Sequence, residues 1–113
     1  MTEDAALHPA EKQVYLRAKL DASYWLGLIA QQRANYPAAV DYFIHRTLEA
    51  LPNGPWTHGA KYNLARIYET SDERKKAVML YRSDSRSPSH HGNLLRARWL
   101  ESQLTEAAAP EEG

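Results

Sequence analysis

Apolar residues recur at helical spacing in two neighbouring segments of the first half of the chain. Residues 25 to 30 are dense enough in apolar side chains to cover most of one helix wall, and a second stripe runs from 39 to 51 at spacings of three and four. The segment 34–37 separates them, because the residue before Pro37 avoids helical angles while a proline suits the first turn of a helix. We therefore predict a helical hairpin over residues 23 to 43.

The second half of the chain repeats this alternation of turn formers and apolar stripes. Pro52-Asn53-Gly54-Pro55 cannot continue a helix and predicts a loop, after which Thr57 or Asn53 can cap a third helix. Ser71-Asp72 supplies the next turn and cap, and the fourth helix carries an apolar face from Ala77 to Tyr81. A second helical hairpin is therefore expected after the loop.

The beginning of the chain leaves two alternatives open. One is a single helix from about 9 to 33, with Pro9 at its first position. The other is a break near Asp21-Ala22-Ser23, where Asp21 or Ser23 can cap a new helix.

The first hairpin resembles a tetratricopeptide repeat, a helical hairpin with a period of about 34 residues. The residues that carry this resemblance are Leu26-Gly27 in the first helix, the turn Ala34-Asn35-Tyr36, and Ala39 and Phe43 in the second helix. Gly27 and Ala39 are small residues at places where two helix backbones can approach closely.

A second copy of the motif follows the first. Its matching residues are Leu64-Ala65, Tyr68, Ala77 and Tyr81. In both copies 12 residues separate the small residue of the first helix from that of the second, Gly27 from Ala39 and Ala65 from Ala77. The excess of the 38-residue offset over the usual period falls in the loop at 52–55.

The resemblance implies an all-α fold in which antiparallel hairpins stack as a short right-handed solenoid with a C-terminal capping helix. We expect one domain over 9–104, composed of repeat-like units at about 20–53 and 58–87 and an end helix at about 92–104. The end helix is either the first helix of an incomplete third repeat or the cap that such arrays need. The segments 1–8 and 105–113 are expected to be disordered tails.

The resemblance also implies a binding surface, since the first helices of such hairpins line a concave groove. The groove positions carried over are Asp21, Tyr24, Leu28, Gln31 and Gln32 in the first copy, and Gly59, Tyr62, Arg66, Glu69 and Thr70 in the second. The candidate partner-binding residues are Tyr24, Leu28, Gln31, Gln32, Tyr62, Asn63, Arg66 and Glu69. Such a mixture of tyrosine, amide and arginine suits an extended peptide.

The aromatic residues also fall on the apolar stripes. Trp25 and Phe43 are predicted to belong to the core of the first hairpin, where replacement by alanine costs about 3–5 kcal/mol. Tyr62, Tyr68, Tyr81 and Trp99 occupy similar positions in the second half and are expected to be core residues as well.

Composition and charge exclude several classes of protein. The 113 residues contain no cysteine, and 14 basic residues balance 14 acidic ones, which argues against a dedicated nucleic-acid binder. Residues 61 to 104 nevertheless hold nine Lys or Arg against five Asp or Glu. The apolar run at 24–30 is far shorter than a membrane-spanning helix, and residues 1–8 do not form a signal peptide, so we expect a cytoplasmic protein.

No pattern of catalytic, metal-binding or cofactor-binding residues is present in the sequence. His90-His91 is the only clustered histidine pair, and no cysteine or carboxylate spacing accompanies it. The chain has neither a Gly-x-Ser-x-Gly elbow nor a glycine-rich phosphate loop. An enzyme is therefore not expected, and neither a metal nor a cofactor is implied.

The sequence favours a protein-interaction module whose partner is a protein or a peptide. The first alternative is a structural or self-assembly domain, either a homodimer formed through Leu95, Trp99 and Leu100 or the terminal piece of a longer repeat array. The second and less favoured alternative is RNA binding through the basic second half.

Overall fold

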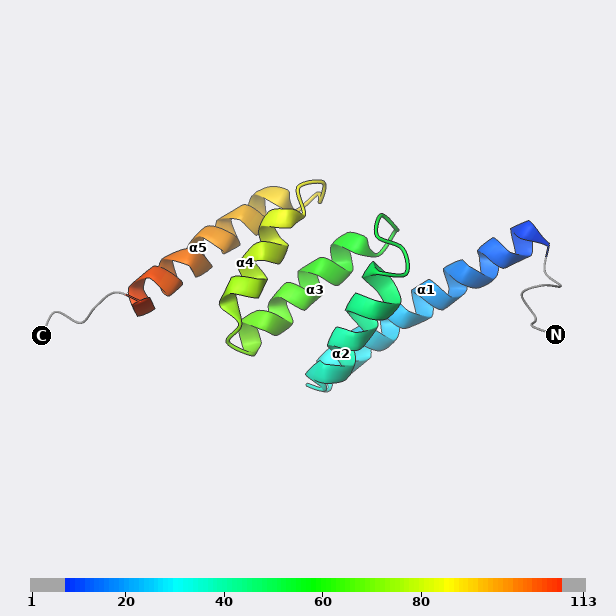
Figure 1. Cartoon of the computed structure of the whole chain (residues 1–113), viewed down its shortest axis with the longest axis horizontal. Helices are drawn as coiled ribbons and strands as arrows, with labels where there is room; N and C mark the ends of the chain where they lie inside the picture. The colour runs from blue at the N-terminus through cyan, green and yellow to red at the C-terminus, as the bar shows by residue number, and fades with distance from the viewer. Residues whose placement is uncertain (1–7, 109–113) are drawn as a thin grey trace, which may run out of the picture. The chain divides into compact units, whose positions relative to one another are not determined.

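Helices account for all of the regular secondary structure in this computed structural model, which describes residues 8–108 (Figure 1). The α-helices are α1 (Pro9–Gln32), α2 (Tyr36–Phe43), α3 (Thr57–Thr70), α4 (Arg74–Ser83) and α5 (His90–Ala108), and the π-helical turn η2 (Ile44–Leu48) continues α2. No β-strand occurs in this described part. The predicted all-α class is therefore confirmed.

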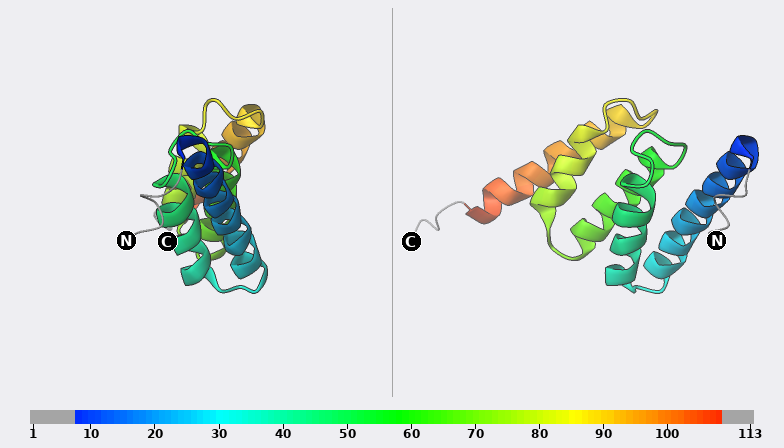
Figure 2. Two further views of the ribbon diagram at one scale, coloured as in Figure 1. Left: turned by 90° about the vertical axis from the view of Figure 1, so that its right-hand side faces the viewer. Right: turned by 45° about the vertical axis from the view of Figure 1, so that its right-hand side comes forward.

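The chain divides into two units with a boundary between Thr57 and His58. Unit 1 contains α1, α2 and η2, while unit 2 contains α4, α5 and all of α3 except its first residue. Within unit 1, α1 and α2 lie side by side, as α4 and α5 do within unit 2 (Figure 2). The predicted repeat-like segments 20–53 and 58–87 fall on opposite sides of this boundary.

A single long helix, α1, opens unit 1. His8 caps it, because its side-chain Nδ1 accepts a hydrogen bond from the backbone N–H of Ala10 at 3.2 Å, and Pro9 occupies the first helical position. Ser23 does not cap a second helix, since its hydroxyl donates back to the Lys19 carbonyl at 2.9 Å within α1. Of the two alternatives, the structure therefore has the unbroken helix.

The core of unit 1 is built on the contact between α1 and Phe43 of α2. Phe43 is completely buried, and the ring of Tyr24 lies tilted against it with the centroids 5.9 Å apart. The other side of the Tyr24 ring stacks on Trp56 at 4.6 Å. Trp25 is 54% exposed, so its predicted place in the core is wrong. It lies one residue beyond Tyr24, about 100° around the helix, and therefore points away from α2.

The π-helical turn η2 was not anticipated from the sequence. An extra residue in the turn lets the hydroxyl of Thr47, which is buried, donate to the carbonyl of Tyr42 five residues earlier at 2.8 Å. The loop that follows is fixed by Thr57, whose hydroxyl accepts from the Gly54 N–H at 2.9 Å and lies 3.1 Å from the Pro52 carbonyl.

Unit 2 has its own core, to which each of its three helices contributes. The buried members are Ala65 of α3, Ala77 and Tyr81 of α4, and Ala97 and Leu100 of α5. Small alanines at three of these places let the helix backbones approach closely. Tyr62 and Trp99 are 43% and 49% exposed, so the prediction that they are core residues is wrong, whereas Tyr81 is buried.

The hairpin turns of the two units have the same backbone conformation. Ala34 and Asp72, 38 residues apart, both adopt a left-handed conformation with φ of 59°. The N–H of the following residue donates to the carbonyl five residues earlier in each turn, Asn35 to Ala30 at 2.8 Å and Glu73 to Tyr68 at 2.7 Å. The offset is that of the two sequence copies. Asp72 therefore closes α3 and does not cap α4, as had been expected.

Two predicted boundaries at the end of the chain differ from the structure. The end helix runs over His90–Ala108 instead of 92–104, so residues 105–108 are helical and not part of a tail. An alanine-rich sequence continues the helix there. The rest of the two predicted tails, 1–7 and 109–113, lies outside the described residues.

Candidate functional site

A cleft of about 730 Å³ opens on the surface of unit 2 and is the strongest candidate site; we call it the unit 2 cleft. Its lining residues are Tyr62, Arg66, Glu69 and Thr70 of α3, Tyr81 of α4, Ser89, and Gly92, Asn93 and Arg96 of α5. Charged and hydrogen-bonding groups therefore dominate its walls, with one exposed aromatic ring among them.

The helical period of α3 brings one set of predicted groove residues into this cleft. Tyr62, Arg66 and Glu69 follow one another at spacings of four and three, which places them on one helix face. The guanidinium carbon of Arg66 lies 5.9 Å from the centroid of the Tyr62 ring, within cation–π distance. Three of the eight candidate partner-binding residues thus share one cleft.

Glu69 is the anionic centre of the cleft and is held by two helices. The Arg96 Nε donates to its Oε1 at 2.9 Å, with Nη2 on the same oxygen, and the Tyr81 hydroxyl donates to Oε2 at 2.5 Å. Burial on its own would raise the pKa of Glu69, but these hydrogen bonds, with the charges of Arg96 and Arg66, lower it. Glu69 is therefore ionised at neutral pH, and its charge compensates that of Arg96.

The same network changes the pKa values of its two donors. Burial, and then the hydrogen bond to Glu69, raises the pKa of the Tyr81 phenol, which stays protonated and keeps donating. The hydrogen bond to Glu69 also raises the pKa of Arg96. All three groups thus hold fixed protonation states over the physiological range, which makes the wall that they form rigid in charge.

Two polar groups of the cleft have no partner within residues 8–108. The Asn93 side chain is only 4% exposed, yet neither its amide nitrogen nor its oxygen makes a hydrogen bond there. The exposed Arg66 guanidinium makes neither a hydrogen bond nor an ion pair with a described residue. Such groups are the ones that a ligand can satisfy.

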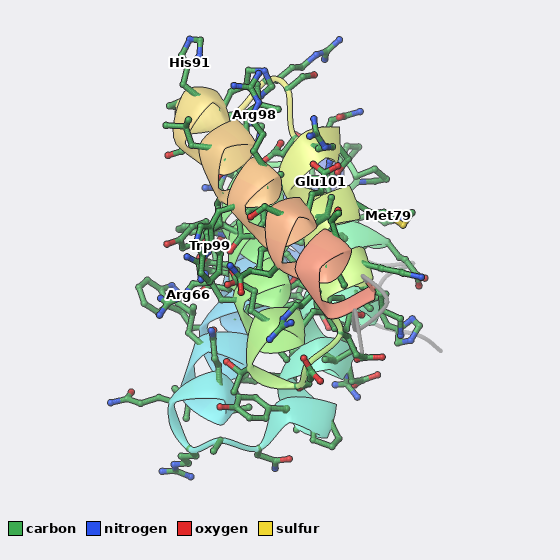
Figure 3. The ribbon with its side chains drawn as sticks, turned by 90° about the vertical axis from the view of Figure 1, so that its left-hand side faces the viewer. Arg66, Met79, His91, Arg98, Trp99 and Glu101 are labelled. Carbon is green, nitrogen blue, oxygen red and sulfur yellow. The ribbon has the colours of Figure 1, made fainter. Side chains whose placement is uncertain are left out.

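An exposed aromatic ring extends this surface along α5. The guanidinium carbon of Arg96 lies 4.3 Å from the centroid of the Trp99 ring. Figure 3 shows Trp99 and Arg66 on the same side of unit 2, with Met79 on the opposite side. Tyrosine, tryptophan and arginine are the residue types that most often dominate the energy of protein interfaces.

The other predicted groove residues are placed differently. Tyr24, in unit 1, is buried between Trp56 and Phe43, contrary to the open groove position expected of it. Its neighbours along α1 range from half-buried to exposed; they are Leu28, Gln31 and Gln32. Asn63 is half-buried, donates to the Gly59 carbonyl at 2.9 Å and does not line the unit 2 cleft.

Sequence reasoning missed the part of the cleft that α5 supplies. Asn93 and Arg96 were not singled out, although Asn93 precedes the buried Ala97 and Leu100 by four and seven residues. A polar residue within an apolar stripe was the available indication. It pointed to a buried amide, which is rare unless the amide has a structural or binding role.

The basic surplus of the second half is largely compensated inside unit 2. Four of its nine basic residues pair with acidic side chains, in the pairs Arg74–Asp72, Lys76–Glu73, Arg82–Glu101 and Arg96–Glu69. This arrangement reduces the free positive charge that a nucleic acid would meet. Among the described residues no group of three or more His, Asp or Glu is placed to hold a metal ion.

A second and more apolar cavity of about 580 Å³ lies in unit 1. Leu16 and Leu20 of α1 line it together with Leu51, and Arg17, Lys19, His45 and Arg46 stand around them. Arg17 is paired with Asp21 at 2.8 Å and Arg46 with Asp41 at 3.2 Å, so most of these cations are compensated. None of the predicted groove residues lines this cavity.

None of the helices in residues 8–108 has both the length and the apolar character required to cross a membrane. Comparison of the chain with protein-family models, with curated protein sequences and with solved structures found no significant match.

Proposed function

We propose that this protein is an interaction module that binds a peptide segment of a partner protein in the unit 2 cleft. The observation that carries the proposal is the meeting of three predicted groove residues, Tyr62, Arg66 and Glu69, in one open cleft. Its exposed tyrosine and unpaired arginine are side chains of the kind that anchor protein partners.

The tetratricopeptide-like organisation belongs to the same proposal. Two hairpin turns with the same left-handed residue and the same hydrogen bonds, 38 residues apart, support a duplicated helical hairpin. Repeats of this kind present the faces of their first helices to a ligand, and α3 is the first helix of the second copy. A cytoplasmic location is part of the proposal as well.

Selection from a library of random peptides displayed on phage, with the full chain as bait, tests this function. The site variant is the double substitution Tyr62→Ala/Arg66→Ala, and the matched control is Met79→Ala/Arg98→Ala. Met79 is 71% exposed and Arg98 is exposed, and neither lines the cleft (Figure 3). Both double variants remove one large side chain and one guanidinium from the surface of unit 2.

Enriched peptides should bind the wild type and the control equally and lose their binding to the site variant. Photocrosslinking from a benzoylphenylalanine at position 62 should capture the selected peptides, whereas the same residue at position 79 should not. If no peptide is enriched, or if both double variants retain every enriched peptide, the proposal is wrong.

Self-assembly is the second candidate function, and the exposed apolar residues of α5 favour it. Leu95 is 64% exposed and Trp99 lies beside it along the helix, whereas Leu100 is part of the core and leaves the proposed dimer face. Sedimentation over a range of concentrations distinguishes the two functions. A dimer that Leu95→Glu/Trp99→Ala converts to a monomer would support self-assembly.

A further inference from the structure

We infer that the unit 2 cleft recognises a carboxylate group of the partner peptide, held by the guanidinium of Arg66 and the side-chain amide of Asn93. This inference rests on the proposed function, because it names the chemistry that the peptide must bring to the same cleft. It is carried by the two polar groups that line the cleft without any partner among residues 8–108.

The first step concerns the cost of leaving Asn93 as it is. A buried amide without a hydrogen-bond partner costs about 1–3 kcal/mol relative to a satisfied one. Asn93 is 4% exposed and lies at the wall of an open cleft, where a bound oxygen can accept from its NH₂ group. An acceptor ligand therefore recovers energy that the free protein lacks.

The second step concerns charge. Arg96 and Glu69 compensate each other through their hydrogen bonds, and both oxygens of Glu69 are already occupied by donors. The cleft is thus left with the single positive charge of Arg66. One uncompensated guanidinium matches a monoanion, whereas a phosphate dianion would retain a negative charge close to Glu69.

The third step concerns shape. A guanidinium offers two parallel N–H groups that match the two oxygens of a carboxylate. The first turn of α5 also faces the cleft at Gly92, and no atom lies within 4 Å of the place where a Cβ would stand there. The positive end of the α5 dipole therefore adds to the attraction for an anion that Arg66 and Asn93 already hold.

Four small probes test the chemistry on the full chain by NMR. N-acetylglutamic acid α-amide offers a side-chain carboxylate, N-acetylalanine offers a chain-terminal carboxylate, N-acetylglutamine amide is the neutral analogue, and methyl phosphate is the dianion. The signals followed are the side-chain NH₂ of Asn93 and the Nε–H of Arg66. Binding in the millimolar range is expected for a single carboxylate.

At least one of the two carboxylate probes should shift both signals in a saturable way, and the stronger of the two identifies the source of the carboxylate in the peptide. The glutamine analogue should leave both signals in place, and methyl phosphate should bind more weakly. Arg66→Gln should weaken carboxylate binding by about tenfold or more, since a hydrogen bond to a charged group is lost. Arg98→Gln, an unpaired exposed arginine of α5 outside the cleft, should change it by less than about twofold.

Four results would overturn the inference: no saturable shift at Asn93 with either carboxylate, tighter binding of methyl phosphate, a glutamine analogue that binds as well as the glutamate one, or equal effects of Arg66→Gln and Arg98→Gln. Amide spectra of each variant check that it is folded, and Arg66→Lys, which keeps the charge without the fork, should retain an intermediate affinity.

The inference and the proposed function can fail separately. If the selected peptides bind in the cleft but contain no required carboxylate, the module function stands and the inference is wrong. If the carboxylate probes bind through Arg66 and Asn93 while no peptide can be selected, the site is an anion site and the peptide-binding function is wrong.

Discussion

The ring of Phe43 in α2 lies directly against the backbone of Gly27 in α1. A Cβ atom placed on residue 27 would stand 2.6 Å from the Phe43 Cε1 atom and 2.9 Å from Cδ1. Because Phe43 is completely buried, its ring has no free space into which it can move. The spacing between α1 and α2 therefore depends on the absence of a side chain at Gly27.

Gly27→Ala should lower the free energy of unfolding by about 1–2 kcal/mol. Overpacking costs about 1–3 kcal/mol, and the better helix propensity of alanine returns up to about 1 kcal/mol of it. The matched control is Gly92→Ala in α5, where nothing lies within 4 Å of the new methyl group, so stability should stay the same or rise. Urea unfolding followed by circular dichroism measures both, and equal effects would contradict the close contact.

Phe43→Ala and Trp25→Ala should differ strongly in cost. The buried Phe43 should lose about 3–5 kcal/mol on truncation, which is a large part of the stability of a small domain. Trp25 is 54% exposed and contacts Tyr24 and Trp56 only edge to face, so its truncation should cost roughly 1 kcal/mol. Thermal midpoints compare them, and a larger loss for Trp25→Ala would show that its ring is buried in solution.

Ala34→Gly should stabilise the protein by up to about 1 kcal/mol. Ala34 adopts a φ of 59°, a left-handed conformation that costs an alanine about 1–2 kcal/mol and a glycine almost nothing, although glycine loses more entropy on folding. The same change at Ala22, an exposed residue inside α1, should destabilise by about 1 kcal/mol. Opposite signs for one chemical change in chemical unfolding experiments would establish the turn conformation.

Glu69→Gln should weaken unit 2 in a way that depends on pH. Because the pKa of Glu69 is lowered in the folded protein, its contribution to stability is complete above its ordinary value of 4.5 and is lost as the pH falls through the folded value. The variant should therefore be less stable than the wild type by about 1–3 kcal/mol at neutral pH, and the gap should narrow in acid.

The exposed pair His45–Glu49 provides the control with the opposite sign. The hydrogen bond from Glu49 raises the pKa of His45 in the folded protein, so this pair stabilises below the ordinary histidine value of 6.5 and stops doing so as the pH rises through the folded value. The effect of Glu49→Gln should therefore shrink toward alkaline pH. Denaturation at several pH values measures both variants, and a constant gap for Glu69→Gln would exclude the charged network.

The sequence by itself determined the helices, their turns and the equal spacing of the two hairpins. These features depend on contacts between residues close in the chain: the prolines open or exclude helices, and apolar residues three and four apart form a stripe on any helix. The left-handed residues Ala34 and Asp72 keep the 38-residue offset for the same reason, because a helix C-terminus is a local structure.

Only the tertiary structure decided which residues of each stripe are buried and which meet at the site. Tyr24 and Trp25 are neighbours in one apolar run, but the rotation of α1 against α2 buries the first and exposes the second. Likewise, Arg96 reaches Glu69 across 27 residues of chain, and Asn93 enters the same cleft, because α5 packs on the alanines of α3 and α4. The sequence pattern fixes the faces of a helix but not its rotation against a neighbour, since that angle is set by how side chains from distant segments fit together.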